Sequence, residues 1–443
     1  MRHASKLTTF LVSTALLSGC AGGGLFKKKA SAKIAGERVA VLVNEADIEV
    51  DPATAALPVS LPAAEVNASW AQSGGNARKS VGHVALGTSL ALAWTASIGE
   101  GSGKTGRLGG GPVVADGKVF TIDTMGVVRA FDAANGGPVW SARFGDAGSN
   151  SSSLFGGGVA VDGGRVYATN GLGYVAALDA GTGAAAWTVR PGGPLRGEPS
   201  VTDGAVYVMS QDNQIFSLKV ADGTTNWSSA AALEIAGVSG AAAPSIAQGT
   251  VVAGFSSGEL NAYRYENGRQ VWQDALSRTS ITTSVASLSD IDADAVIDGG
   301  AVYAVGQGGR MVALDLISGQ RIWELNFAGI ATPWVVGDWL FAVNDKAQLI
   351  AISRANGKIK WINQLPRYEN MKKKSGAISY VGPVLAGDRL VLAASNGVLI
   401  NVDPGSGSFQ SQTNVGGGVS FQPVVANNTL YILTDAGRLI AYR

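Results

Sequence analysis

The stretch VVADGKVFTIDTMGVVRAFDAANGGPVW (113–140) contains the repeating unit of this chain. It holds an apolar run, an Asp-Gly turn, two further apolar runs joined by a Gly turn, a second Gly-rich turn, and a last run that contains Trp140. Two clear further copies occupy residues 159–187 and 296–323. Each copy predicts four short antiparallel strands, which is the unit of one β-propeller blade.

The first turn of the unit recurs along the whole chain. Its residue pairs tolerate the positive φ angles that tight hairpin turns require. The eight copies lie 39 to 50 residues apart, at Asp116-Gly117, Asp162-Gly163, Asp203-Gly204, Gln248-Gly249, Asp298-Gly299, Gly337-Asp338, Gly387-Asp388 and Asn427-Asn428. One blade cannot bury both of its faces, so the sequence predicts an all-β, eight-bladed propeller of four-stranded antiparallel blades.

The two ends of the repeat region predict how the ring closes. The last copy (424–443) stops after its third strand, whereas LALAWTASIG (90–99) is a fourth strand with no three strands before it. We therefore expect the N-terminal strand to complete the last blade, which removes an open sheet edge.

Tryptophan also recurs once per unit. Residues 94, 140, 187, 227, 272, 323 and 361 are tryptophans, and Phe409 stands at the eighth position. We expect these indoles to pack between neighbouring blades.

The N-terminus predicts export and a lipid anchor. Residues 1–19 have the basic start, apolar run and small residues of a signal peptide. Cys20, the only cysteine, follows Leu17-Ser18-Gly19, which resembles a bacterial lipobox. We expect Cys20 to be acylated, residues 20–65 to form a flexible tether, and residues 66–443 to form the propeller. The apolar segment 38–43 could dock on the body as an extra strand.

Charge and motifs exclude several classes of function. The chain has 34 basic and 33 acidic residues, a balance that does not favour a nucleic-acid partner. GEGSGKTG (99–106) departs from the phosphate-loop pattern, because Ile98 stands where the first glycine belongs and a strand is expected to follow instead of a helix. Only His3 and His83 are present, so no histidine-based metal site or triad is expected, and we predict no cofactor.

The segments Ala130–Trp140 and Ala313–Trp323 carry Ala-x-Asp-x-x-x-Gly-x-x-x-Trp, which resembles the repeat of pyrroloquinoline-quinone (PQQ) propellers. Together with the lipobox and the tether, the eight repeats resemble the BamB family, lipoprotein subunits of the outer-membrane β-barrel assembly machinery. That resemblance implies a non-enzymatic scaffold on the periplasmic side of the outer membrane. It also implies binding of the BamA subunit and help for unfolded barrel substrates.

Two loops carry the more specific resemblance. PLRGEPS (194–200) resembles a family segment that helps to bind BamA, with Leu195 as an apolar anchor and Arg196 as a multi-donor cation. SLSDIDAD (287–294) resembles a second such segment and gives Asp290 and Asp292 as partner-binding residues.

The sequence alone leaves other interpretations open. Both loops could be ordinary blade connections, and Asp290 and Asp292 could pair with Arg196 inside the protein. The rival functions are a PQQ-dependent dehydrogenase-like enzyme and a small-ligand-binding periplasmic propeller. A vicinal cysteine pair, which many such dehydrogenases carry, is excluded by the single cysteine.

Overall fold

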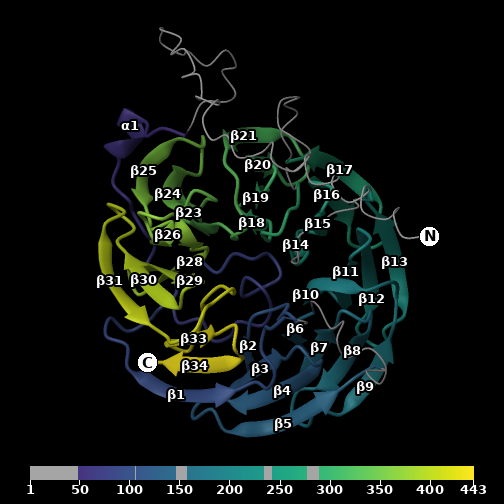
Figure 1. Ribbon diagram of the computed structural model, residues 1–443. Helices are drawn as coiled ribbons and strands as arrows, with labels where there is room; N and C mark the ends of the chain where they lie inside the picture. The colour runs from purple at the N-terminus through teal and green to yellow at the C-terminus, as the bar shows by residue number, and fades with distance from the viewer. Residues whose placement is uncertain (1–47, 105, 146–156, 234–241, 277–288) are drawn as a thin grey trace, which may run out of the picture. The chain divides into compact units, whose positions relative to one another are not determined.

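The computed structural model describes residues 48–104, 106–145, 157–233, 242–276 and 289–443. Residues from Asp47 to Arg443 form one compact unit. Within its described part, eight four-stranded antiparallel sheets stand around a ring, and one two-stranded sheet is inserted between two of them (Figure 1). The described part contains no helix that is long and apolar enough to cross a bilayer. The predicted propeller of eight blades is confirmed.

The blades share one order, in which the first strand lies innermost and the fourth lies at the rim (Figure 1). The first four blades are β2 (Val113–Ala115), β3 (Lys118–Ile122), β4 (Val127–Asp132) and β5 (Pro138–Arg143); β6 (Val159–Asp162), β7 (Arg165–Thr169), β8 (Val175–Asp179) and β9 (Ala185–Val189); β10 (Leu195–Thr202), β11 (Ala205–Ser210), β12 (Gln214–Lys219) and β13 (Thr225–Ala230); and β14 (Ser245–Ala247), β15 (Thr250–Gly254), β16 (Glu259–Arg264) and β17 (Gln270–Ala275).

The remaining four blades repeat this order. They are β18 (Val296–Asp298), β19 (Ala301–Val305), β20 (Arg310–Asp315) and β21 (Arg321–Asn326); β22 (Trp334–Val336), β23 (Trp339–Val343), β24 (Gln348–Ser353) and β25 (Ile359–Gln364); β28 (Tyr380–Ala386), β29 (Arg389–Ala394), β30 (Val398–Val402) and β31 (Phe409–Asn414); and β32 (Val424–Ala426), β33 (Thr429–Leu433) and β34 (Arg438–Tyr442) with β1 (Leu92–Ser97).

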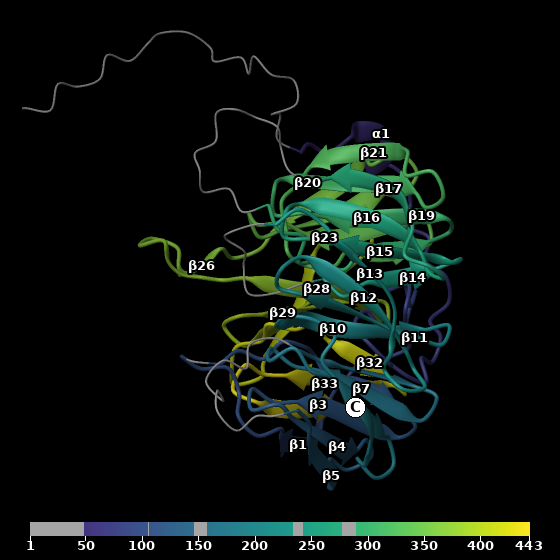
Figure 2. The ribbon, with the colours of Figure 1, turned by 90° about the vertical axis from the view of Figure 1, so that its right-hand side faces the viewer.

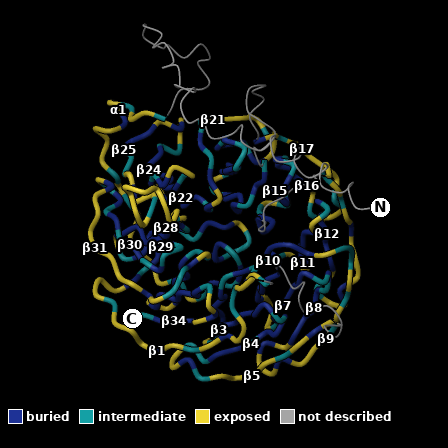
Figure 3. Tube along the Cα trace, in the orientation of Figure 1, coloured by how far each residue is buried: buried dark blue, intermediate teal, exposed yellow. Residues whose placement is uncertain are grey.

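The core follows from this order. Second and third strands are almost fully buried between neighbouring blades, whereas the fourth strands expose alternate residues at the rim (Figure 3). This pattern is the one that stacked sheets with an outer edge require.

The hairpin turns lie where the repeat predicts them, with a shift of one residue in two blades. Asp116 and Gly117 have φ of 49° and 71°, as a type I′ turn requires. In the second and fifth blades the Asp still pairs in the ladder, as Asp162 does with Arg165. The turn there is Gly163-Gly164 or Gly299-Gly300, because two consecutive glycines adopt positive φ without a Cβ clash.

The ring closes as predicted. β1 pairs antiparallel with β34, and its register runs from Leu92 opposite Tyr442 to Ser97 opposite Arg438. The N-terminal strand is therefore the fourth strand of the eighth blade.

The repeated tryptophans connect each blade to the next, as expected. Each indole Nε1 donates a hydrogen bond of 2.8–3.2 Å to a backbone carbonyl in the turn between the third and fourth strands of the following blade. Each ring also lies against the glycine of that turn, so a Cβ added there would be 2.5–2.9 Å from the indole. The seven pairs are Trp94–Gly136, Trp140–Gly183, Trp187–Gly223, Trp227–Gly268, Trp272–Gly319, Trp323–Gly357 and Trp361–Gly407. The Gly and Trp of the repeat are thus complementary halves of one contact between blades.

The expectation that Phe409 is the eighth member of this series is wrong by two residues. Ser411 pairs with Asn401 as Trp140 pairs with Ala130, whereas Phe409 stands where Pro138 stands in the first blade. The seventh blade therefore has no indole at this position, and the next blade has two separate strands, β34 and β1, where the other blades have a Gly turn. Without that turn there is no carbonyl and glycine for an indole to contact, and the Phe409 side chain is 57% exposed.

Residues 67–87, which we call the channel segment, run across the inner strands of all eight blades. In Figure 1 the purple trace between α1 (Pro52–Ala55) and β1 passes over the middle of the ring. The contacts by blade, from the first to the eighth, are Trp70 with Val114, Ala71 with Val161, Gln72 with Val201, Ala77 with Ile246, Arg78 with Ile297, Gly82 with Trp334, Val84 with Leu385, and Asn67 with Val425. These hydrogen bonds satisfy inner-strand groups that would otherwise lack a partner in the sheet.

The described part of the expected tether, residues 48–65, also lies on the propeller. Val50 forms a parallel bridge with Ile359, and the Asp51 N–H donates to the Ile359 carbonyl at 2.9 Å. Lys360 Nζ donates to the carbonyls of Ala55 and Leu57. The chain's own N-terminal segment therefore covers the beginning of β25 at the rim. The signal peptide, Cys20 and segment 38–43 lie outside the described residues.

One element of the fold was not predicted. Between the sixth and seventh blades the chain forms a hairpin of β26 (Tyr368–Asn370) and β27 (Ser375–Ala377). Figure 2 shows this hairpin standing out from the ring on one side.

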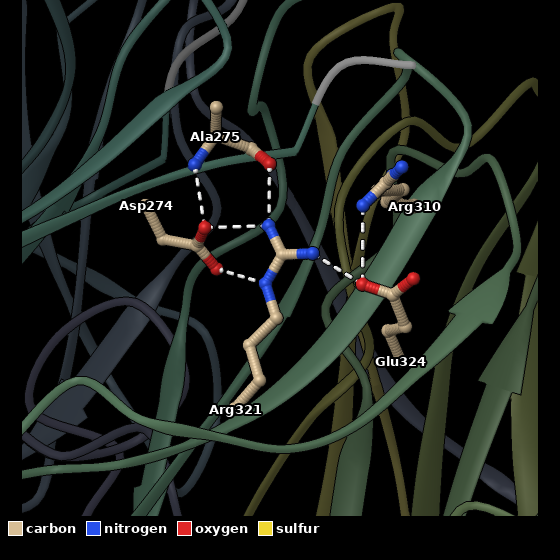
Figure 4. Close-up of polar contacts among 5 residues, drawn as sticks. All are labelled: Asp274, Ala275, Arg310, Arg321 and Glu324. Carbon is tan, nitrogen blue, oxygen red and sulfur yellow. Dashed lines mark hydrogen bonds and ion pairs between the residues drawn. The ribbon is translucent and has the colours of Figure 1, made fainter. Parts of the chain in front are cut away.

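An ion network joins the fourth and fifth blades at the rim (Figure 4). The Arg321 guanidinium donates to both carboxylate oxygens of Asp274, at 2.8 and 2.5 Å, and to the Ala275 carbonyl at 3.0 Å. Arg321 also bonds to Glu324, which accepts from Arg310 at 3.1 Å. These contacts raise the pKa of Arg321, with the Asp274 hydrogen bonds as the largest cause.

Candidate functional site

Arg196 lies at the start of the innermost strand of the third blade, where that strand is irregular. Arg196 pairs with Met209 and Ser200 pairs with Tyr207, so the inner strand has two more residues than its partner between these points. Gly197 takes up the bulge with a φ of 72°. Bulges redirect side chains, and this one occurs in the segment that contains both Arg196 and Glu198.

Residues 289–295, before the fifth blade, form the second part of the site. The Ile291 N–H donates to the Phe255 carbonyl at 3.2 Å, and the Gln307 N–H donates to the Asp290 carbonyl at 2.9 Å. The Gln307 side chain also donates to Asp292 Oδ2 at 2.7 Å. Backbone and side-chain contacts therefore fix both aspartates against the fourth and fifth blades.

The structure brings three of the four predicted site residues together. Arg196 Nη1 lies 3.9 Å from Asp290 Oδ1, with side chains that are 8% and 1% exposed. Among the described residues, Arg196 Nε and Nη2 and Asp292 Oδ1 are buried and have no hydrogen-bond partner. A buried donor without a partner costs about 1–3 kcal/mol, so these atoms are prepared to gain from an added acceptor or donor.

The electrostatics of the cluster follow from this burial. Burial lowers the pKa of the Arg196 guanidinium, and the charges of Asp292 and Asp290 partly oppose that shift. Burial also raises the pKa of Asp292 to about 6; the Asp290 charge adds to this shift, whereas Arg196 opposes it. The cluster therefore holds more carboxylate than its single guanidinium can neutralise.

Leu195 differs from the expectation of an apolar anchor on the surface. Its side chain is 0% exposed and belongs to the core between the second and third blades, packed with Val175, Val206 and Phe216. The reason is register: Leu195 pairs with Ser210 inside the ladder, so its side chain faces the neighbouring sheet. It supports Arg196 from within the core.

A second charged cluster was missed by sequence reasoning. Lys79 of the channel segment is 3% exposed and donates to Ser200 Oγ at 2.9 Å. Glu198 Oε1 accepts from the Gly111 N–H at 2.7 Å, and Asp294 accepts from Ser73 Oγ at 2.6 Å. Glu198 is part of the quoted segment 194–200, but nothing in the sequence indicates that Lys79 would approach it.

The pKa shifts in this second cluster again reflect burial. Burial raises the pKa of Glu198 to about 8, the Asp294 charge adds to this, and the Gly111 hydrogen bond and the Lys79 charge oppose it. Burial lowers the pKa of Lys79, while Asp294 and Glu198 oppose that change. Among the described residues, no group of three or more His, Cys, Asp or Glu side chains is placed to hold a metal ion.

Comparison with known proteins relates this fold and site to one family. The family model described as outer membrane protein assembly factor BamB matches residues 82–152 and 124–363. Curated relatives of that name include the protein from Yersinia pestis, 29% identical over 79% of this chain and 88% of the relative. The Salmonella typhimurium relative is 31% identical over 79% of this chain and 87% of the relative. The Vibrio cholerae relative is 32% identical over 78% of this chain and 86% of the relative.

Solved structures show the same fold. BamB from Moraxella catarrhalis superimposes with a TM-score of 0.68 at 20% identity, over 80% of this chain and 100% of that one. The quinohemoprotein alcohol dehydrogenase from Comamonas testosteroni gives a TM-score of 0.65 at 14% identity, over 84% and 80%. The propeller is thus common to assembly factors and enzymes, so the fold alone does not assign a function. By the match of its family model and the identity to curated relatives, this chain belongs to the family of outer membrane protein assembly factor BamB.

Proposed function

We propose that this chain is a non-enzymatic assembly factor for outer-membrane proteins and that it acts as a scaffold on the BamA subunit. The names of its relatives support the assembly role. The observation that carries the partner site is the buried Arg196 side chain, whose Nε and Nη2 have no partner among the described residues. Both donors are covered in the free chain, so an acceptor supplied by another protein would satisfy them once a local rearrangement on binding uncovers them.

The site combines donors with an acceptor. Arg196 offers two N–H groups, and Asp292 Oδ1 offers an acceptor that is buried without a partner among the described residues. A carboxylate or backbone carbonyl of BamA would bind to Arg196, and a backbone N–H would bind to Asp292. In this proposal Asp290 holds the guanidinium in place from 3.9 Å, and Leu195 positions the strand from the core.

We also propose that Cys20 carries the lipid anchor and that the propeller faces the periplasm at the outer membrane. Incorporation of labelled palmitate into wild type, and its loss in Cys20→Ser, would support the anchor. Labelling that persists in Cys20→Ser would overturn it.

Affinity co-purification from detergent-solubilised membranes tests the partner and the site separately. Arg196→Met removes the donors but keeps an apolar stem, and Asp292→Asn keeps the size of the side chain. Arg264→Met is the matched control, because Arg264 is an exposed arginine at the end of β16. We expect BamA with wild type and the control, and little BamA with the two site variants when circular dichroism shows them folded.

The outcomes separate the two claims. If the folded Arg196→Met variant co-purifies BamA at the wild-type level, the proposed site at Arg196 is wrong, but the proposed role as a scaffold on BamA stands. Absence of BamA from the wild-type sample would overturn the role itself, and stoichiometric quinone in that sample would favour the dehydrogenase-like rival.

A further inference from the structure

The hairpin of β26 and β27, residues 367–377 with its base, carries an excess of positive charge. It contains Arg367 and Lys372, Lys373 and Lys374 against one acidic residue, Glu369, in a chain whose net charge is +1. Figure 2 shows it extending beyond the ring. Its excess positive charge therefore stands clear of the body.

The tip of the hairpin presents three lysines and one apolar side chain. Residues 371–374 form the loop, and all four are exposed, with Met371 at 61%. None of the three lysine side chains forms an ion pair or hydrogen bond with another described residue. The hairpin thus offers cations that nothing in the described chain neutralises.

The hairpin is held at its base, so the tip keeps its position. The Ile378 N–H donates to the Arg367 carbonyl at 3.0 Å, and the Tyr380 hydroxyl donates to the Pro366 carbonyl at 2.8 Å. Tyr380 is 5% exposed and belongs to the largest core cluster. At the tip the Lys373 N–H donates to Asn370 Oδ1 at 3.0 Å, which fixes the loop.

The side-chain types favour a lipid surface over a protein partner. Lysine is depleted in protein–protein interfaces, where arginine and aromatic residues are enriched. Clusters of four or more basic residues beside an apolar side chain are typical of contact with anionic headgroups, because the ammonium groups stay at the headgroup level while the apolar group enters the interface.

The position of the hairpin fits the same partner. The N-terminal segment joins the body at Val50 on Ile359, the first residue of β25. The hairpin begins four residues beyond the other end of that six-residue strand, about 20 Å away. The described N-terminal segment and the hairpin therefore join the body at the two ends of the same strand.

We propose that this hairpin is a second membrane contact, in which Lys372, Lys373 and Lys374 bind anionic phospholipid headgroups and Met371 enters the interface. With the N-terminal anchor it would limit the rotation of the propeller on the membrane. The proposal does not depend on BamA binding.

Vesicle binding by residues 20–443 carrying Cys20→Ser tests whether the hairpin lysines bind anionic lipid, because this chain cannot carry an acyl chain at residue 20. We expect binding to vesicles of phosphatidylethanolamine with phosphatidylglycerol and much weaker binding to phosphatidylcholine alone. Replacing the three lysines by Gln should weaken binding to the phosphatidylglycerol-containing vesicles roughly a hundredfold, about fivefold for each charge. The matched control replaces Lys219, Arg264 and Arg269 by Gln, which removes equal charge from exposed positions elsewhere on the propeller and should leave binding near wild type.

A single thiol tests the insertion. Because Cys20 is the only cysteine, Met371→Cys in the Cys20→Ser chain can carry one environment-sensitive fluorophore. We expect a blue shift on anionic vesicles at position 371 and none for Ile317→Cys, an apolar control that is 74% exposed. The proposal is overturned if the wild-type chain binds neutral and anionic vesicles equally, if both triple variants lose the same amount of binding, or if the hairpin variant binds as well as wild type. It is also overturned if the fluorophore responds in the same way at positions 371 and 317. Retention on an acidic protein without vesicle binding would also overturn it.

Discussion

The contact between Trp94 and Gly136 allows a controlled test of why the repeat contains its glycine. Gly136 has a φ of 75°, and a Cβ added there would lie 2.5 Å from the Trp94 ring. Gly117, in the same blade, has a φ of 71° and nothing within 4 Å of an added Cβ. Alanine at either position suffers the same backbone strain, but only Gly136→Ala also collides with an indole.

The magnitudes follow from these two terms. An L-residue in the left-handed region costs about 1–2 kcal/mol. Gly117→Ala should lose only this amount from the free energy of unfolding. Overpacking adds about 1–3 kcal/mol, so Gly136→Ala should cost about 2–5 kcal/mol. Trp94 cannot easily move, because it is 8% exposed and its Nε1 donates to the Ala133 carbonyl at 3.2 Å.

Calorimetric melting of the chain with Cys20→Ser gives the comparison. At an unfolding entropy of about 2.1 cal/mol/K per residue, one kcal/mol corresponds to about 1 °C for a body of this size. The gap between the two variants should therefore be about 1–3 °C and should close in a Trp94→Ala background. Equal losses for both glycines, or a gap that survives without the indole, would refute the explanation.

Three further predictions concern the channel, the second charged cluster and the rim. Trp70→Ala should cost about 3–5 kcal/mol, because the 2%-exposed Trp70 stacks on Trp334 with ring centroids 6.2 Å apart; hydrogen exchange should then accelerate in the inner strands that residues 67–87 cover. Glu198 has a pKa raised to about 8 in the folded chain, so it stays protonated there after it has lost its proton in the unfolded chain. Its contribution to stability is therefore fully present below the pKa of the unfolded chain and is lost as the pH rises towards 8. Over this range the melting temperature of Glu198→Gln should fall less than that of wild type. Arg321→Gln should cost about 1 kcal/mol by losing Asp274, and the loss should shrink in high salt in denaturant titrations.

The repeat could be predicted from the sequence because each of its signals is local. Turn pairs such as Asp116-Gly117 specify hairpins within a few residues, and the incomplete copies at 90–99 and 424–443 leave one way to close the ring. The shift of two turns to Gly163-Gly164 and Gly299-Gly300 is also local, because Gly-Gly accepts positive φ more readily than Asp-Gly.

The channel segment and the charged clusters could not be predicted, because they depend on contacts between distant parts of the chain. Lys79 contacts Ser200, 121 residues away, and only the closed ring brings them together. The resemblance of segment 194–200 to a partner-binding segment implies an apolar anchor at Leu195, but the bulge after Arg196 leaves Leu195 in the ladder. Spacing alone does not reveal which residue of such a segment faces the core.

We propose that this propeller binds BamA through Arg196. The most direct measurement is the dissociation constant between residues 20–443 carrying Cys20→Ser and the soluble periplasmic domains of BamA, for wild type, Arg196→Met and the Arg264→Met control. Removing a buried charged partner costs about 2 kcal/mol or more, so we predict a loss of at least roughly thirtyfold for Arg196→Met and none for Arg264→Met. Equal affinity of the folded Arg196→Met variant and wild type would show that Arg196 does not bind BamA.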